Sequence, residues 1–378
     1  MEFTEEEEFI RQTAREFARK EIEPVALKHE RSETYPREIV REAAEIDLTA
    51  PSLPVEYGGS GFDSVAKCIV FDELHRIDPG IAESVTASTF GCEVIVENGS
   101  KDQANMYVEP AASGEIITAT AMTEPRGGSD FANIETDAAR DGAEYVLNGD
   151  KVFITNGSLA DAIVVYTRTN DADPPHRGIS AFVVESDNPG VDQTKMEGYL
   201  GPSTVDIGQV FLNDVRVPVK ARIGEEDQAF YYAMETMNQS RLDVAASAIG
   251  AARGALNRAT AYIEDRDAFG QTVAKYQSVR HRLADLETRL QAARSLTYET
   301  AREMEDGALE SGQKPAMAKL FASELCEEVA SEAIQLHGGY GVFAEYRVES
   351  FFRWTKATQI YDGTSAIMRE VIADDLLS

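Results

Sequence analysis

The sequence is poor in cysteine and has no long apolar run. Its three cysteines, Cys68, Cys92 and Cys326, lie far apart in a chain of 378 residues and form no Cys-X-X-Cys pair or Cys/His cluster. This spacing excludes the usual thiolate metal sites, and so small an odd number is typical of a reducing compartment. No segment approaches the roughly 18 apolar residues of a membrane span, and the acidic start of the chain lacks the apolar core of a secretory signal. We therefore expect a cytoplasmic protein that does not use a membrane.

Positive charge is the second scarcity. The chain has 36 basic and 66 acidic residues, a net charge of −30, which argues against nucleic acid or an anionic membrane as the main partner. Only 11 of the basic residues are lysines, and the other 25 are arginines. A crowded acidic surface with few lysines is typical of proteins that work in high salt, where screening makes it tolerable. We expect a salt-adapted protein, with an ordinary acidic cytosolic enzyme as the alternative.

The periodicity of apolar residues divides the chain into three parts. Helical spacing dominates residues 1–115 and 223–378, whereas short β-branched runs dominate residues 116–222. The expected helices cover about 36–47, 64–77, 81–97, 241–265, 277–304, 315–336 and 364–377. The expected strands cover 116–122, 145–147, 151–155, 163–167, 179–184 and 209–212, with Asn148-Gly149 as a hairpin turn. This order is not the βαβ alternation of a Rossmann domain, and neither a GxGxxG nor a P-loop motif follows a strand.

Two segments of the middle part suit cofactor chemistry. Met122-Thr-Glu-Pro-Arg-Gly-Gly-Ser-Asp130 ends a predicted strand with a glycine pair between hydroxyl and acidic side chains. Glycines let backbone N–H groups approach an anion such as a diphosphate, although a plain polar turn has the same composition. Phe153-Ile-Thr155 offers an aromatic ring and a hydroxyl, which suit a flat heterocycle by stacking and hydrogen bonding. An aromatic side chain facing the core is the alternative there.

Three further segments lie in the last third. Arg266 ends a helical run, where an arginine can bind a phosphate bidentately or pair with one of many nearby carboxylates. The segment Gln335-Leu-His-Gly-Gly-Tyr-Gly341 has more glycines than a helix end needs, which indicates close approach of another chain or a ligand. Asp362-Gly363-Thr364 is either a reactive carboxylate in a turn or a helix N-cap.

In this order along the whole chain, the five segments resemble those of the acyl-CoA dehydrogenase family, flavoenzymes that oxidise acyl-CoA thioesters to α,β-enoyl-CoA. Residues 122–130 resemble the family's first signature, and residues 335–367 resemble its second. The resemblance implies an acyl-CoA dehydrogenase-like fold with an N-terminal all-α domain, a middle β-barrel or sandwich domain and a C-terminal four-helix bundle. It also implies FAD as cofactor, an electron-transfer flavoprotein as electron acceptor, and a homotetramer built as a dimer of dimers.

The resemblance further implies a role for each matching residue. The flavin and its ribityl–phosphate chain would be contacted by Met122, Thr123, Ser129, Phe153 and Thr155. The diphosphate and adenosine would be held, partly from a neighbouring subunit, by Arg266, Phe269, Gln277, Gln335, Gly338 and Gly339, with Thr364 as a further FAD contact. The acyl-CoA substrate would be contacted by Ser129, Asn238, Arg241 and Gly363.

The reaction needs a base that removes the α-proton while the β-hydrogen leaves as hydride. In most of the family this base is a Glu just before the Gly-Thr of the second signature, where this chain has Asp362. The family's second location for the base corresponds to Ser240, which cannot serve. Asp362 is therefore the candidate base, one methylene shorter than Glu. We expect a bulkier, branched or cyclic acyl group to accompany it, because a misplacement of about 1 Å can cost about a hundredfold in rate.

Thr86 and Ser88 belong to a hydroxyl-rich helix that lines the acyl pocket in the family, which favours a short or polar acyl chain; a solvated helix face is the alternative. Two other functions stay open. One is the same fold with diverged flavin chemistry, such as an oxidase, a monooxygenase or a desulfinase. The other is a FAD-binding protein without turnover.

Overall fold

The computed structural model describes residues 3–309 and 311–377 and has a helical first part, a β-rich middle and a helical last part. The helices are α1 (Glu5–Phe17), α2 (Ala26–Ser32), α3 (Arg37–Ala44), α4 (Ser64–His75), α5 (Pro79–Thr86), α6 (Cys92–Asn98), α7 (Lys101–Gln103), α8 (Glu109–Ala112), α9 (Ala229–Asp265), α10 (Gln277–Glu305), α11 (Gln313–His337), α12 (Glu349–Thr358) and α13 (Ser365–Leu377). The strands are β1 (Thr118–Ala121), β2 (Asp137–Asp141), β3 (Glu144–Thr155), β4 (Ala162–Arg168), β5 (Ile179–Glu185), β6 (Val191–Lys195), β7 (Ile207–Pro218), β8 (Arg222–Ile223), β9 (Asp267–Ala268) and β10 (Gln271–Thr272).

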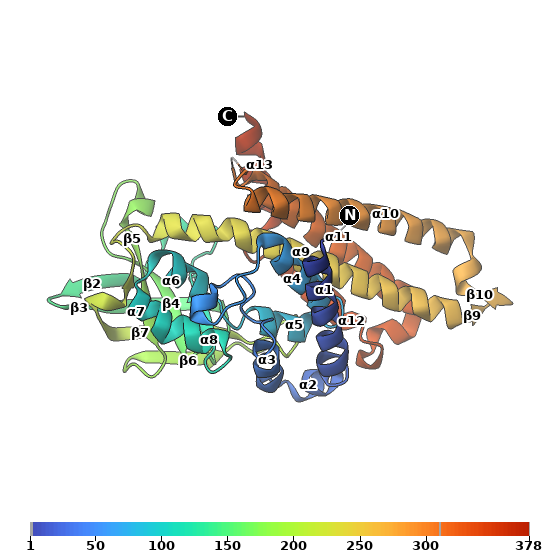
Figure 1. Ribbon diagram of the computed structural model, residues 1–378, viewed down its shortest axis with the longest axis horizontal. Helices are drawn as coiled ribbons and strands as arrows, with labels where there is room; N and C mark the ends of the chain where they lie inside the picture. Colours follow the sequence, from blue (N-terminus) through green and yellow to red (C-terminus); the bar gives the residue numbers. More distant parts are fainter. Residues whose placement is uncertain (1–2, 310, 378) are drawn as a thin grey trace.

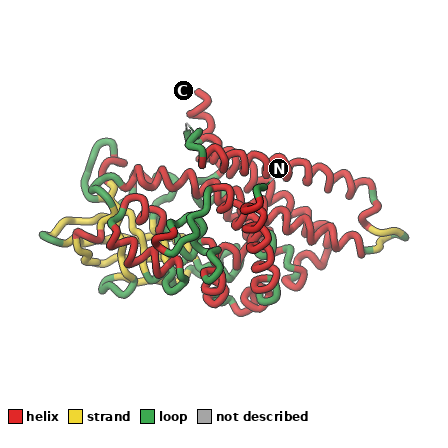
Figure 2. The backbone as a smooth tube through the Cα atoms, in the orientation of Figure 1, coloured by secondary structure: helices red, strands yellow, loops and turns green. Residues whose placement is uncertain are grey.

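The long helix α9 connects the two ends of the molecule. Figure 1 shows the main sheet at one end and the β9–β10 hairpin at the other, with α9 running between them. Figure 2 shows the same division, because nearly all the strand-coloured backbone gathers at the sheet end. Within the described residues, none of the helices combines the length and the apolar character needed to cross a bilayer.

Helix α4 packs unusually closely against α9 because two glycines of α9 remove the side chains in between. A Cβ atom built on Gly250 would lie 2.2 Å from the carbonyl oxygen of Asp72, and one on Gly254 would lie 2.1 Å from that of Arg76. Any side chain at these two positions would therefore force the helices apart.

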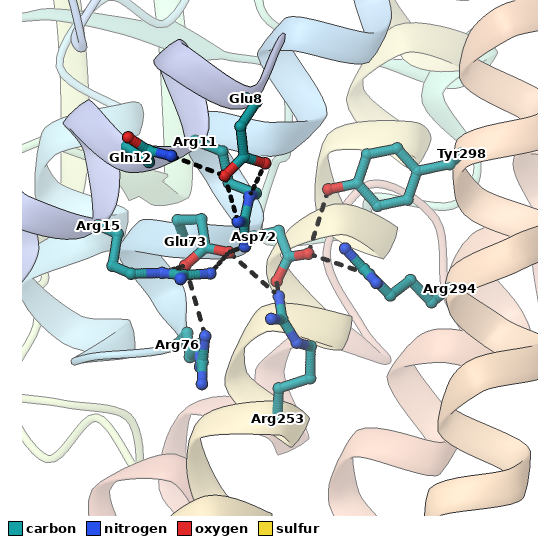
Figure 3. A network of polar contacts seen from close by, with 10 residues as sticks. All are labelled: Glu8, Arg11, Gln12, Arg15, Asp72, Glu73, Arg76, Arg253, Arg294 and Tyr298. Atoms are coloured by element: carbon teal, nitrogen blue, oxygen red, sulfur yellow. Dashed lines mark hydrogen bonds and ion pairs between the residues drawn. The ribbon is translucent and has the colours of Figure 1, made fainter. Parts of the chain in front are cut away.

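A network of ion pairs joins α4 to three other helices (Figure 3). Glu73 accepts two hydrogen bonds of 2.9 Å from Arg15 of α1. Asp72 accepts hydrogen bonds from Arg253 of α9 and, at 3.1 Å, from the hydroxyl of Tyr298 of α10. Both carboxylates are almost completely buried, so each depends on these partners to offset its lost hydration.

The main sheet has eight strands in the order β6-β7-β3-β2-β4-β5-β8, with β1 paired to β4. The predicted hairpin turn at Asn148-Gly149 is wrong, because β3 runs straight through these residues. They form a bulge, in which Asn148 accepts a hydrogen bond of 2.8 Å from the backbone N–H of Asp214 on β7. Gly149 has φ +147°, and a Cβ there would lie 2.5 Å from the Thr136 hydroxyl. The Asn-Gly pair thus serves a bulge, which also tolerates unusual φ values.

Several helix predictions need correction as well. The predicted helix over 81–97 is two helices, α5 and α6, because the chain turns sharply at Gly91, which has φ +96°. Helix α9 starts at Ala229, well before the predicted residue 241, and α12 was not predicted at all. Asp78 caps the N-terminus of helix α5, because its carboxylate accepts a hydrogen bond of 2.9 Å from the N–H of Ile81. Pro79 is the first residue of the helix.

Candidate functional site

The candidate base Asp362 lies in a tight turn between α12 and α13. Its φ is +52°, and that of the following Gly363 is +92°. A non-glycine residue in this left-handed region is held there only by its surroundings, and such positions cluster at functional sites.

Lys319 of α11 holds this turn from below. Its Nζ donates hydrogen bonds to the carbonyl oxygens of Tyr361 and Gly363, the residues on either side of Asp362. Burial lowers the pKa of Lys319 to about 8, and the negative charge of Asp362 acts against this lowering. A buried ammonium group thus fixes the backbone of the turn and places a positive charge beside the carboxylate.

Ser240 of α9 contacts the Asp362 carboxylate directly. Its hydroxyl donates a hydrogen bond of 2.7 Å to Oδ2 of Asp362. Burial raises the pKa of Asp362, while the charge of Lys319 and the hydrogen bond from Ser240 lower it. The charge of Glu83 on α5 raises the pKa of Asp362 further. These effects produce a carboxylate that is a stronger base than an exposed aspartate but still has three groups, Lys319, Ser240 and Arg241, that stabilise its ionised form.

Two residues predicted to contact substrate lie one helical turn apart beside this carboxylate. Arg241 is 8% exposed and donates a hydrogen bond of 3.1 Å from Nη1 to Oδ1 of Asn238, but its buried Nε has no hydrogen-bond partner among the residues that the structure describes. Burial lowers the pKa of Arg241, and the charge of Asp362 acts against this. Gly312 leaves room for the pair, because a Cβ there would lie 2.7 Å from Oδ1 of Asn238. The structure therefore brings Asn238, Arg241, Asp362 and Gly363 together.

The predicted flavin contacts of the middle part form a second group, on the sheet. Phe153 has φ +59° and is 65% exposed, so its ring points away from the core. The side chains of Thr123, Ser129 and Thr155 have no hydrogen-bond partner within residues 3–309 and 311–377. A Cβ built on Gly127 would have no atom of a described residue within 4 Å, apart from its chain neighbours. An exposed aromatic ring, unpaired hydroxyls and an accessible backbone are typical of a site for a flat, polar ligand, and they are not expected of a plain polar turn.

The loop that carries Thr123 and Ser129 is fixed by contacts of Met122 and Glu124. The ammonium group of Lys151, a fully buried residue of β3, donates to the carbonyl oxygen of Met122 at 3.1 Å and to the Glu124 carboxylate at 2.8 Å. Glu124 also accepts hydrogen bonds from the backbone N–H groups of Glu135 and Thr136. Glu124 thus shapes the loop rather than the ligand surface.

The remaining predicted FAD contacts lie far from the sheet. Arg266 and Phe269 belong to the β9–β10 hairpin at the opposite end of the molecule (Figure 1), and Gln277 begins α10 beside it. Phe269 is 99% exposed, and Arg266 has no ion pair with any described residue, so the carboxylate alternative for Arg266 is not observed. Gln335, Gly338 and Gly339 lie at the end of α11, next to α9 through the stacked rings of His337 and Tyr262 at 4.3 Å. Within one chain, these residues are not brought together with Phe153 and Thr155.

Thr364 lies at the start of α13 and accepts a hydrogen bond of 3.3 Å from the N–H of Ile367, as an N-cap does. The local sequence did not point to Lys319 or Glu83. Each is a charged residue inside an apolar helical stretch, Ala318-Lys319-Leu320 and Ala82-Glu83-Ser84-Val85, and this was the available signal.

The order of the three parts, helical, β-rich and helical, is the architecture of an acyl-CoA oxidoreductase. Family models for the N-terminal, middle and C-terminal domains of acyl-CoA dehydrogenase match residues 4–115, 119–215 and 227–377. The chain therefore belongs to the acyl-CoA dehydrogenase family, and the predicted fold class is confirmed. It is an oxidoreductase of a family that binds FAD.

Relatives span the whole chain. It is 36% identical over 378 residues to an acyl-CoA dehydrogenase of Bacillus subtilis, covering 100% of this chain and 99% of that protein. It is 38% identical over 383 residues to the caffeyl-CoA reductase-Etf complex subunit CarC of Acetobacterium woodii, with both chains fully covered. The structure of butyryl-CoA dehydrogenase from Megasphaera elsdenii matches with a TM-score of 0.95 at 33% identity and covers 100% of both chains.

Proposed function

We propose that this protein dehydrogenates a short, branched or cyclic acyl-CoA to the α,β-enoyl-CoA, with Asp362 as the base that removes the α-proton. The observation that carries the proposal is the turn at Asp362, where a partly buried carboxylate with a raised pKa is held by Lys319 and Ser240. Raising a carboxylate's pKa towards neutrality increases its strength as a general base.

The residues around the sheet fit FAD. Phe153 offers an exposed ring for the isoalloxazine, and the hydroxyls of Thr123, Ser129 and Thr155 are free to donate to its ring and phosphate chain. Met122 would contact the flavin, and Thr364 would be a further contact. When bound, FAD supplies the acceptor for the hydride that leaves the β-carbon.

The protein's own residues perform the other half of the reaction. Asp362 accepts the α-proton at its carboxylate, and Ser240 keeps that carboxylate in one orientation. The backbone N–H of Gly363 follows the base directly in the chain. A donor is needed there, because the thioester oxygen gains negative charge as the α-proton leaves. The free Nε of Arg241, with Asn238 beside it, suits the anionic CoA end of the substrate.

We further propose a homotetramer in which one subunit completes the FAD site of another. The group on the sheet lies at one end of the molecule, and a second group lies towards the other end, made up of Arg266, Phe269, Gln277, Gln335, Gly338 and Gly339. One FAD can therefore use both groups only across two subunits. Arg266 has no ion pair within the described part of the chain, and Phe269 at the hairpin tip is 99% exposed, and both observations support this arrangement.

The electron acceptor in this proposal is an electron-transfer flavoprotein. One relative is a subunit, CarC, of a caffeyl-CoA reductase-Etf complex, and this supports such a partner for the present chain. We place the protein in the cytoplasm of a salt-adapted organism, on the strength of its net charge of −30.

A second candidate is the same fold with diverged flavin chemistry, such as an oxidase, a monooxygenase or a desulfinase. It is kept because Asp362 is shorter than Glu and the other base position is Ser240. Anaerobic titration of the yellow protein with short straight, branched and cyclic acyl-CoAs in high salt separates the two. Bleaching of the flavin by one class supports dehydrogenation and names the class. A flavin that no acyl-CoA bleaches would favour the second candidate.

A further inference from the structure

Lys151 of β3 carries a buried charge that the proposed reaction does not use. Its ammonium group donates to the Glu124 carboxylate at 2.8 Å and to the carbonyl oxygen of Met122 at 3.1 Å. Lys151 is 0% exposed and Glu124 is 6% exposed. A buried ammonium group loses its hydration and needs such partners, whereas an apolar side chain of similar length would need none. Packing of the sheet alone therefore does not explain a lysine at this position.

The carboxylate of Glu124 connects this ammonium group to the segment before β2. It accepts hydrogen bonds from the backbone N–H groups of Glu135 at 2.6 Å and of Thr136 at 2.8 Å. The backbone of Glu124 also closes a tight turn, because its carbonyl oxygen accepts a hydrogen bond of 3.0 Å from the N–H of Gly127. One carboxylate thus joins β3, the segment before β2 and the loop of residues 122–130.

This loop and β3 are the two segments that carry the predicted flavin contacts of the sheet. The backbone N–H of Val152 donates a hydrogen bond of 2.9 Å to the carbonyl oxygen of Thr123, so the loop runs directly beside the strand. The pairing of β3 with β7 shifts its register between Lys151 and Ile154. Because of this bulge, Lys151 and Val152 are both buried, while the next residue, Phe153, is exposed with φ +59°. Lys151 therefore contacts the loop and lies two residues from the exposed ring.

Both members of the buried pair are charged at neutral pH. Burial lowers the pKa of Lys151 to about 8, and the charge of Glu124 acts against this lowering. Burial acts to raise the pKa of Glu124, but the charge of Lys151 and the hydrogen bonds to the carboxylate outweigh it and lower that pKa. The contact is thus a charge-assisted hydrogen bond, which is stronger than one between neutral groups.

We propose that Lys151 is a positioning residue for FAD, which together with Glu124 holds the loop at Thr123 and the strand at Phe153 in the arrangement that binds the cofactor. The inference rests on the proposed function, because it takes Thr123 and Phe153 to contact FAD. Without the ammonium group, the carbonyl oxygen of Met122 and the Glu124 carboxylate lose a donor in a buried place. The loop then has to be ordered when FAD binds, and ordering a loop on binding reduces affinity.

The test measures the Kd of FAD, from the fluorescence of flavin released when the holoprotein is diluted. This readout needs neither substrate nor turnover. Lys151→Met removes the charge at similar length, and Lys151→Arg keeps a charged donor. The matched control is Lys67→Met, because Lys67 of α4 is also buried and its Nζ lies 2.9 Å from Oδ2 of Asp243 on α9, in the helical part of the protein.

We expect Lys151→Met to raise the Kd of FAD about tenfold or more, because a hydrogen bond to a charged group is lost. Lys151→Arg should lie closer to the wild type, and Lys67→Met should leave the Kd unchanged. Thr123→Val is then made in both backgrounds. If Lys151 acts by holding Thr123, the effect of Thr123→Val on the Kd should be at least about threefold smaller in Lys151→Met than in the wild type.

An unchanged Kd of FAD in Lys151→Met, an equal rise in Lys67→Met, or an equal effect of Thr123→Val in both backgrounds would overturn the inference. If Lys151→Met does not fold, Glu124→Gln replaces it, because this variant keeps an oxygen for the backbone N–H groups and removes the charge that faces Lys151. An unchanged Kd in Glu124→Gln would be equally contrary to the inference.

The experiment also separates this inference from the proposed function. A wild type that binds FAD but is bleached by no acyl-CoA would overturn the proposed dehydrogenation, and the Kd values would still decide the role of Lys151. A wild type that does not bind FAD would overturn both.

Discussion

Removing the Ser240 hydroxyl tests whether Asp362 is the base. In Ser240→Ala, the carboxylate loses a hydrogen bond of 2.7 Å at Oδ2. Because this bond lowers the pKa of Asp362, its loss raises that pKa, and the acidic limb of the pH–rate profile should move to higher pH. A hydrogen bond to a charged group contributes about 1.5–3 kcal/mol. About 1.4 kcal/mol corresponds to a tenfold change in protonation, so the rate on the acidic limb should fall about tenfold or more.

The assay is kcat/KM against pH for the holoprotein, because this parameter reports the free enzyme's essential groups. On the plateau, where Asp362 is ionised in both proteins, the two rates should approach each other. Ser240→Thr keeps a hydroxyl on the same atom and is the matched control, with its acidic limb close to the wild-type position. An acidic limb that does not move in Ser240→Ala, or a uniform loss of rate at every pH, would refute the assignment.

Three further predictions concern other parts of the chain. Asp362→Asn should retain bound FAD, measured by its absorbance, yet show no bleaching by any acyl-CoA, and retained turnover would contradict the proposal. The pKa of Lys319 is about 8 in the folded protein, against an ordinary 10.5. Between these two pH values Lys319 is protonated in the unfolded chain and deprotonated in the folded protein. The free energy of unfolding should therefore rise with pH from about 8 to 10.5. Lys319→Met should lack this rise. The free energy of unfolding in urea is measured for wild type and variant at about pH 8 and about pH 10.5. The difference between the two proteins should change with pH, and an equal difference at both pH values would contradict the reasoning. Arg253→Met leaves the buried Asp72 with Tyr298 and Arg294 as its remaining partners among the described residues. It should destabilise the protein by about 3–5 kcal/mol in denaturant unfolding, whereas a change below about 1 kcal/mol would mean that the network in Figure 3 contributes little.

The spacing of apolar residues was the sequence feature that predicted secondary structure best. Apolar residues at helical spacing correctly indicated α10 and α11, because an amphipathic helix buries one face whatever lies against it. The Asn148-Gly149 pair misled, because the same conformational freedom serves a hairpin turn or a bulge, and the choice depends on Asp214 and Thr136 of neighbouring segments.

By itself, the sequence determined the three-part order, the family and the identity of the candidate base, since these depend on residue types at fixed positions along the chain. Only the tertiary structure decided how that base is held. Ser240, Lys319 and Glu83 lie 122, 43 and 279 residues from Asp362 in sequence, and no local pattern links them to it. Burial decides their chemistry, because a charge that is harmless on the surface changes the pKa of its neighbours once packing removes the water between them.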